Sequence, residues 1–389
     1  MSREFDIIIY GATGYTGRLV AEYLTSHYAG RKDAPTWAMA GRSVDKLAEI
    51  RDLIGAPKTT PLVVADAGDT ASLNAMVRRA RVIITTVGPY QLYGSDLVAA
   101  CVEHGTDYVD LCGEPLWMRE MIDAHQAAAE KSGARITFSC GFDSIPFDLG
   151  VWFLQEEAIK RHGAPAPRVK GRVRKMQGGA SGGTVASLTA TMKAIAKKPS
   201  LALQLKDSFC LTPGYSGPSQ PTGLMPAYDS ATGTWTAPFI MAPINTKNVH
   251  RSNFLLGHRW GKGLVYDEMV MTTIGDAGRA MAEALAKANP FGESNKLMPG
   301  DGPTAEEREN GFYDILFVGE YPDGSEVRAS VQGDRDPGYG STSKMISEAA
   351  IGLLSCKAKG GVWTPGAAMG GDLVARLSAE AGLTFQIEN

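Results

Sequence analysis

At 389 residues the chain is too long for one ordinary hydrophobic core, so its length predicts two domains. A net charge of −3 supplies no basic surface for nucleic acid, and no apolar stretch approaches the about 20 residues that would span a bilayer. The five cysteines are scattered and the six histidines lack metal-ligand spacing. We therefore expect no metal, no nucleic-acid partner and no membrane span. The first residues carry acidic side chains and lead directly into the first strand, which is not the pattern of a signal peptide, so we expect a cytoplasmic location.

An apolar run at residues 7–10 predicts a central parallel strand, and three glycines at three-residue spacing follow it before a helical pattern begins. Strand, glycine-rich turn and helix together form the first unit of a dinucleotide-binding fold. Gly11 allows the sharp turn, Gly14 lets backbone N–H groups approach a pyrophosphate, and Gly17 lets the helix pack close to the sheet. The expected phosphate-binding loop consists of Gly11, Ala12, Thr13, Gly14, Tyr15, Thr16 and Gly17.

Residues 37–40 predict a second strand, and the residue type at its end bears on the choice of nucleotide. An NAD-specific site usually places an acid there to bind the ribose 2′-hydroxyl. This chain instead has Arg42, with Ser43 beside it and Lys46 one turn into the next helix. Because these cations suit a 2′-phosphate, the sequence predicts NADP over NAD. The alternative is a solvated arginine, with Ser43 acting only as a helix N-cap.

Further apolar runs at residues 62–65, 82–87, 108–109 and 136–138 complete the pattern of a doubly wound α/β sheet. Such sheets bind their ligand outside the carboxyl ends of the strands, so the residues at those ends form the expected site. The cofactor-binding candidates there are Asp66, near the adenine, and Val87, Gly88 and Pro89. The catalytic candidates are Tyr90, Asp110, Cys112 and Asp143.

Tyr90 is the first choice as proton donor, because its loop should lie beside the nicotinamide. The alternative is a ring that packs on the cofactor without transferring a proton. Asp110, Cys112 and Glu114 can orient a substrate or relay a proton, whereas their structural alternatives are helix capping and, for the thiol, burial as a small hydrophobe. Asp143 can likewise act on the substrate or a proton, and its structural alternative is again helix capping.

The pattern changes after residue 150, where additional strands predict an α+β substrate or oligomerisation domain at 151–340 with a largely antiparallel sheet. Alternation at 168–176 predicts a strand with a solvated basic face, and 312–332 reads as a hairpin. Residues 212–243 combine Gly, Pro, Ser and Thr with aromatic side chains, which favours a long functional loop or lid.

Helical patterns at 279–288, 341–354 and 371–381 complete the chain, and residues 295–310 between them predict a polar loop. The final helices, at about 341–389, are expected to pack back on the nucleotide-binding domain at 1–150. The predicted fold class is therefore α/β, with an N-terminal Rossmann-type, doubly wound parallel sheet followed by the α+β domain.

Several motifs together resemble the saccharopine dehydrogenase-like superfamily and, more narrowly, its branch of trans-acting enoyl reductases. They are Gly11–Arg18, Ala40-Gly41-Arg42, Val87-Gly88-Pro89-Tyr90, Gly141–Pro146, Ser181-Gly182-Gly183-Thr184, Lys296–Gly300 and Asp336-Pro337-Gly338-Tyr339. The resemblance implies an NADP(H)-dependent reductase with a Rossmann domain and an α+β second domain. In the enoyl-reductase branch the substrate is an unsaturated acyl or polyketide chain carried by a partner protein.

Two other functions stay open on the sequence. An amino-acid dehydrogenase of the saccharopine dehydrogenase type would need paired arginines to clamp carboxylates, and Arg251 and Arg259 are the candidates. A non-catalytic NADP-binding scaffold or sensor would keep the fold without turnover. The expected partners are a small-molecule or carrier-bound acyl substrate and a second copy of the chain in a homodimer.

Overall fold

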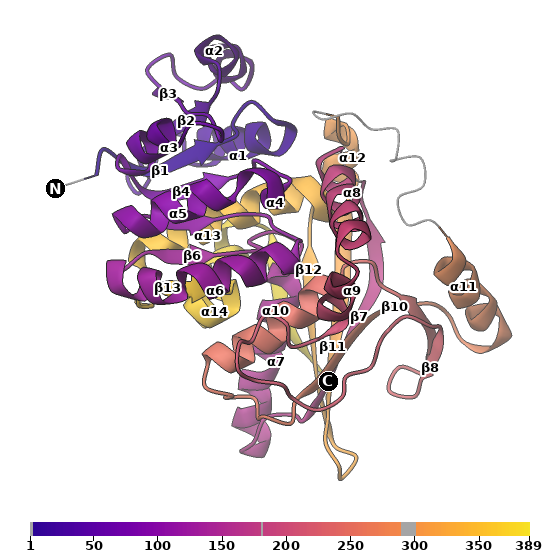
Figure 1. The fold of residues 1–389 in the computed structure, drawn as a ribbon. Coiled ribbons are helices and arrows are strands. Elements are labelled where there is room, and N and C mark those ends of the chain that lie inside the picture. The colour runs from indigo at the N-terminus through magenta and orange to yellow at the C-terminus, as the bar shows by residue number, and fades with distance from the viewer. Residues whose placement is uncertain (1–2, 180–181, 289–300) are drawn as a thin grey trace.

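The computed structural model describes residues 3–179, 182–288 and 301–389, which are organised around two seven-stranded sheets (Figure 1). Two motifs of the sequence resemblance fall wholly or partly elsewhere: Ser181 and residues 296–300 lie outside the described part of the chain. Within the described ranges, no helix is both long and apolar enough to cross a membrane.

The first sheet is parallel throughout. Its strands are β1 (Phe5–Tyr10), β2 (Trp37–Gly41), β3 (Leu62–Val64), β4 (Ala80–Thr85), β5 (Asp107–Val109), β6 (Arg135–Thr137) and β13 (Gly361–Trp363). They lie in the order β13-β6-β5-β4-β1-β2-β3. The order reverses between β1 and β4, the switch point at which a doubly wound sheet binds its ligand. The predicted Rossmann-type sheet is confirmed, and β13 extends it from the far end of the chain.

Helices cover both faces of this sheet. They include α1 (Tyr15–His27), α2 (Val44–Leu53), α3 (Thr70–Val77), α4 (Tyr90–Tyr93), α5 (Ser95–His104) and α6 (Pro115–Ser132). The next helix, α7 (Ile145–His162), packs against the second sheet. Alternation along β1 divides the core: Ile7 and Ile9 lie in the same cluster as side chains of α1, whereas Ile8 and Tyr10 lie with those of α3, α5 and α6. The uninterrupted apolar run is therefore explained by burial on both faces.

The second sheet is largely antiparallel, as expected; only β7 and β10 pair in parallel. Its order is β14-β12-β11-β7-β10-β9-β8. The strands are β7 (Arg168–Gln177), β8 (Ala227–Asp229), β9 (Thr234–Pro238), β10 (Val265–Met271), β11 (Phe312–Glu320), β12 (Glu326–Gly333) and β14 (Leu383–Glu388). The predicted hairpin is β11 and β12. Because β8 and β9 form an edge ribbon within 212–243, that segment is not the single long loop the sequence suggested.

The predicted solvated basic face of β7 is wrong. Arg172 is only 3% exposed and forms ion pairs with Asp229 and Asp267, at 2.5 and 3.1 Å. Lys170 likewise pairs with Asp229 and Glu320. Acidic side chains on neighbouring segments therefore neutralise this strand, which a pattern within the strand alone cannot reveal.

The remaining helices belong to the later part of the chain. They are α8 (Gly182–Lys197), α9 (Ser200–Lys206), α10 (Ala242–Leu255), α11 (Gly275–Lys287), α12 (Ala305–Asn310), the π-helix η2 (Pro337–Ser341), α13 (Thr342–Ser355) and α14 (Pro365–Glu380). The end of the predicted loop at 295–310 is helical, because Thr304 and Glu307 form a capping box at the start of α12. Residues 289–300 lie outside the described ranges.

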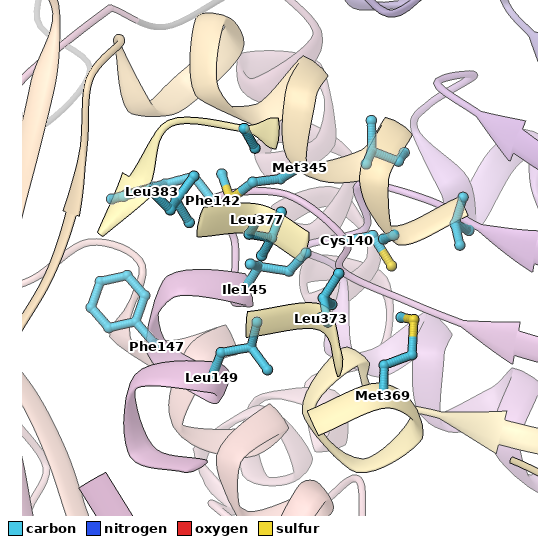
Figure 2. Packing of buried hydrophobic residues seen from close by; sticks show 14 of the residues in the cluster. Cys140, Phe142, Ile145, Phe147, Leu149, Met345, Met369, Leu373, Leu377 and Leu383 are labelled. Atoms are coloured by element: carbon cyan, nitrogen blue, oxygen red, sulfur yellow. The ribbon is translucent and has the colours of Figure 1, made fainter. Parts of the chain in front are cut away.

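The C-terminal segment at 341–389 joins both sheets. Helix α13 packs against α1 and β4, whereas β14 pairs with β12 in the second sheet. Figure 2 shows Phe142, Ile145, Met345 and Leu373 in one cluster, which joins the loop after β6 to α7, α13 and α14. The division into domains at residue 150 stays a prediction, and α7 runs through that position.

Candidate functional site

The glycine loop after β1 forms a cradle that a side chain would fill. Gly11 has φ = 92°, and a Cβ atom on Gly17 would lie 2.1 Å from the carbonyl oxygen of Gly11. Helix α1 starts after Gly14 and no side chain caps it, so its first backbone N–H groups stay available. A dinucleotide pyrophosphate fits this combination of close backbone approach and uncapped donors.

The cations predicted to bind a 2′-phosphate lie at the end of β2. Arg42 and Lys46 are exposed, and neither forms an ion pair with a described residue. Ser43 caps α2, since its Oγ atom accepts the Lys46 backbone N–H at 3.3 Å. Burial raises the pKa of Tyr10 to about 12, with the charge of Asp66 adding to the rise and that of Arg42 opposing it. Arg42 and Asp66 therefore both lie near Tyr10, at the carboxyl ends of the strands, where we expect the nucleotide to bind.

The loop after β4 is held by a carboxylate from the loop after β5. Glu114 accepts the backbone N–H groups of Tyr90 and Gln91, each at 2.9 Å, and also the Gln91 side-chain amide. This contact satisfies the N-terminus of the short helix α4. The Gln91 amide also donates to Thr191 of α8 at 3.2 Å, which brings α8 beside the strand ends. Of the expected cofactor contacts here, Val87 and Pro89 are half-buried and Gly88 is exposed.

The environment of Tyr90 favours a structural role over proton donation. Its side chain is 5% exposed and its ring stacks on Trp117. The hydroxyl donates to the Thr85 carbonyl at 3.3 Å and accepts the Leu111 backbone N–H at 3.1 Å. Burial, reinforced by the charge of Asp110, raises the pKa of the phenol well above its usual value.

Asp110 and Cys112 are also fully buried, and their contacts join the loops after β5 and β6. The Asp110 carboxyl accepts the backbone N–H of Cys112 at 3.0 Å, that of Ser139 at 2.8 Å and the Tyr108 hydroxyl at 2.8 Å. Burial raises the pKa of Asp110 to about 7 and that of the Cys112 thiol well above its usual value. The Asp110 carboxyl therefore holds the two loops together, whereas the Cys112 thiol accepts the Glu114 backbone N–H, at 3.3 Å, within its own loop.

Asp143 differs from these residues because it is half-buried, and its carboxyl forms no hydrogen bond with a described residue. Its Oδ2 atom faces Gly113 across the ends of β5 and β6. Desolvation raises the pKa of Asp143 to about 7. Near neutral pH the protonated and the ionised forms of this carboxyl are therefore both populated, as a general acid or base requires.

The residue after Asp143 is conformationally strained. Ser144 has φ = 137°, outside the usual range of residues other than glycine. Its hydroxyl accepts the side-chain amide of Asn248 at 2.6 Å and donates to Asn245 at 3.3 Å, and Asn245 donates to Glu268 at 2.9 Å. This buried network from α10 and β10 holds the loop that carries Asp143. This network could not be predicted from the sequence, because polar side chains inside a helix give no apolar periodicity to detect.

A second contact from the later part of the chain reaches the glycine loop. Arg308 of α12 donates to the Tyr15 hydroxyl at 2.9 Å and to the Pro303 carbonyl at 2.8 Å. A cavity of about 570 Å³ lies at this junction and is also lined by Arg18 and residues 301–305. The two parts of the chain therefore meet at the expected phosphate loop as well as at Ser144.

The arginines considered as a carboxylate clamp do not form one. Arg251 is buried, and its guanidinium donates to the carbonyl oxygens of Leu211 and Val362, each at 2.6 Å. Arg259 pairs with Glu156 at the surface. Both guanidinium groups therefore have structural partners, and the geometry does not favour the amino-acid dehydrogenase alternative.

Comparison with known proteins gives the family of the chain. Residues 7–136 match the saccharopine dehydrogenase NADP-binding domain. A trans-acting enoyl reductase from Mycobacterium ulcerans (strain Agy99) is 36% identical over 96% of this chain and 96% of its own length. The chain belongs to the trans-acting enoyl reductase branch of the saccharopine dehydrogenase-like superfamily. A Mycobacterium tuberculosis (strain ATCC 25618 / H37Rv) relative, provisionally assigned the same activity, is 40% identical over 99% of this chain and 97% of its own.

Membership of this family agrees with the fold. A solved saccharopine dehydrogenase (L-Glu forming) from Saccharomyces cerevisiae matches with a TM-score of 0.54, covering 98% of this chain and 99% of that chain at 10% identity. At this identity the likeness shows the fold alone. With the matched NADP-binding domain and the named relatives, the chain is an NADP-dependent oxidoreductase and its cofactor is NADP(H).

Proposed function

We propose that the protein reduces the carbon–carbon double bond of an enoyl thioester whose acyl chain is attached to a carrier protein. The names of the family relatives support this substrate class. The single observation that carries the proposal is the half-buried Asp143, whose carboxyl has a raised pKa and lies beside Gly113 at the strand ends where we expect the cofactor to bind.

The chain's own residues account for binding and protonation. The glycine loop would hold the pyrophosphate, and Arg42 with Lys46 would bind the 2′-phosphate. When bound, NADPH supplies a hydride for the β-carbon of the enoyl group. Asp143 then donates its proton to the α-carbon and recovers one from solvent before the next turnover. The saturated thioester has gained one hydride and one proton, so the reaction balances.

Within this proposal Tyr90, Asp110 and Cys112 are positioning residues. Tyr90 joins the loop after β4 to Leu111, and Asp110 joins the loops after β5 and β6. Their burial keeps them from the reacting atoms, so Asp143 replaces Tyr90 as the preferred proton donor.

Crotonyl-pantetheine, a short enoyl thioester, tests the function directly. We expect the protein to consume NADPH with this thioester and to form the butyryl thioester, which mass spectrometry identifies. With NADPH deuterated at the transferred position of C4, the product should gain one deuterium at its β-carbon. Consumption of NADPH with an oxo acid and an amino acid, but not with the thioester, would support the amino-acid dehydrogenase alternative. Binding of NADPH without turnover of either would support a scaffold or sensor.

The homodimer stays a prediction that sedimentation equilibrium can test.

A further inference from the structure

The chain contains a long interval without acidic residues. Between Ala158 and Lys206 there are eleven lysines and arginines and no aspartate or glutamate. The cations of this interval have different surroundings: Lys160 and Arg161, at the end of α7, pair with Glu157 of the same helix. Four of the five cations on β7 pair with acids of other segments, as Arg172 does with Asp229 and Asp267, and the fifth is the exposed Lys175. Those on α8 and α9 form no ion pair with a described residue.

The unpaired group around α8 and α9 consists of Lys193 and Lys197 on α8, Lys198 directly after it, and Lys206 at the end of α9; all four side chains are exposed. Lys193 and Lys197 are four residues apart and therefore repel one another on the helix surface. Two large apolar side chains are exposed among these lysines: Met192 is 58% and Leu203 is 72% exposed. We call this set of six side chains the lysine face.

The lysine face lies beside the proposed site. Thr191, which directly precedes Met192, accepts the side-chain amide of Gln91 at 3.2 Å. Gln91 in turn binds Glu114 at the ends of β4 and β5. Figure 1 shows α8 next to α4, with α9 continuing along the same side. A partner seated on α8 and α9 would therefore lie next to the strand ends that are expected to bind cofactor and substrate.

We propose that the lysine face is the docking surface for the acidic carrier domain that delivers the enoyl thioester, an inference that rests on the proposed function. Exposed, uncompensated cations attract a carboxylate-bearing partner, and the two apolar side chains offer a small contact that excludes water. A second copy of the chain fits less well, because a two-fold interface centred here would oppose lysine to lysine. An anionic membrane also fits less well, since two exposed large apolar side chains make a narrow apolar face for burial in lipid.

The test compares a triple variant, K193Q/K197Q/K198Q, with a charge-matched control, K32Q/K131Q/K359Q, whose exposed lysines lie elsewhere on the molecule. The substrates are crotonyl thioesters on a phosphopantetheinylated acyl carrier domain and on free pantetheine. We expect the lysine-face variant to lower kcat/KM about tenfold for the carrier-bound substrate, mainly through KM, and to leave the free thioester unchanged. The wild-type reaction with the carrier should also weaken as salt is added.

Wild-type kinetics with the carrier-bound substrate in the variant would overturn the proposal. An equal loss with free crotonyl-pantetheine, or an equal loss in the control variant, would also overturn it, because the lysines would then not act by docking. Loss of a wild-type dimer in the lysine-face variant, seen by sedimentation, would assign the face to self-association. Loss of binding to anionic phospholipid vesicles, with carrier kinetics retained, would assign it to a membrane.

A binding measurement separates this proposal from the proposed function. Fluorescence anisotropy of the labelled carrier domain reports docking whether or not the thioester is reduced. If the wild-type protein reduces neither thioester, the enoyl-reductase function fails. Docking is then supported only when the carrier binds the wild type and the control more tightly than the lysine-face variant. Absence of binding to the wild type would overturn docking by itself.

Discussion

The Oδ2 atom of Asp143 lies 3.2 Å from the position that a Cβ atom would take on Gly113. These residues belong to the loops after two neighbouring parallel strands, β6 and β5, so the sheet brings them together across 30 positions of sequence. The small residue at 113 leaves room for the Asp143 carboxyl at the edge of the site.

Replacing Gly113 with alanine should therefore displace the Asp143 carboxyl by a few tenths of an ångström. We expect kcat for crotonyl-pantetheine to fall about tenfold, because proton transfer depends on close alignment, while the Kd for NADPH stays unchanged. Gly263→Ala is the matched control, since a Cβ atom there meets only open space. Equal kcat values for Gly113→Ala and the wild type would show that the carboxyl position does not limit the reaction.

Tyr90→Phe separates a structural tyrosine from a proton donor. The substitution removes the contacts of the hydroxyl with Thr85 and Leu111. We expect the free energy of unfolding to fall by about 1 kcal/mol, measured by urea denaturation, with kcat retained. A large loss of kcat in a variant of normal stability would return the proton-donor role to Tyr90.

Arg42→Ala tests the 2′-phosphate site. Loss of a charge-assisted contact costs about 1.5–3 kcal/mol, so NADPH affinity should fall by about 10- to 100-fold. The affinity for NADH should stay the same, because that nucleotide lacks the 2′-phosphate. Fluorescence titration measures both, and Arg279→Ala on the distant helix α11 serves as control (Figure 1). A parallel loss of both affinities would point to a general structural effect of the substitution.

The positions of many candidate residues could be predicted from the sequence, because a doubly wound sheet binds its ligand outside the carboxyl ends of its parallel strands. The glycine loop before an uncapped helix, Arg42 at the end of β2 and Asp143 after β6 all lie at the strand ends where the sequence placed them, while their roles in binding stay predictions. Their separate roles were not, because burial decides them. The sequence favoured Tyr90 as the proton donor, yet Tyr90 is buried among structural partners, whereas Asp143 is half-buried and its carboxyl has no hydrogen-bond partner among the described residues.

The second half of the chain was less predictable, since its organisation depends on polar contacts between residues far apart in the sequence. Ser144 and Asn248 are separated by 104 positions, and no local pattern marks their hydrogen bond. The cations of β7 looked solvated because the acids that neutralise them, such as Asp229, lie on other segments. Non-local pairs of this kind need the folded chain to become visible.

The raised pKa of Asp143 also has a consequence for stability. An aspartate has a pKa of about 3.9 in an unfolded chain, whereas that of Asp143 in the folded protein is about 7. Between these values the folded state holds a proton that the unfolded state has released. Its contribution to stability is therefore full below about pH 4 and is lost as the pH rises through about 7.

Asp143→Asn should remove this dependence. We expect the Tm of the variant, relative to the wild type, to rise as the pH increases from about 4 to about 8. Asp372→Asn, an exposed substitution on α14, is the control and should show no such trend. A Tm difference between Asp143→Asn and the wild type that is independent of pH would contradict the assigned environment of Asp143.

The most direct test of the central claim is the pH dependence of kcat for NADPH-driven reduction of crotonyl-pantetheine, in the wild type and in Asp143→Asn. A general acid must be protonated to act, so wild-type kcat should fall as the pH rises through about 7. The variant should be about 100-fold slower and should lack that inflection, with NADPH affinity retained. Matching rates and pH profiles in the two proteins would contradict the assignment of Asp143 as the proton donor.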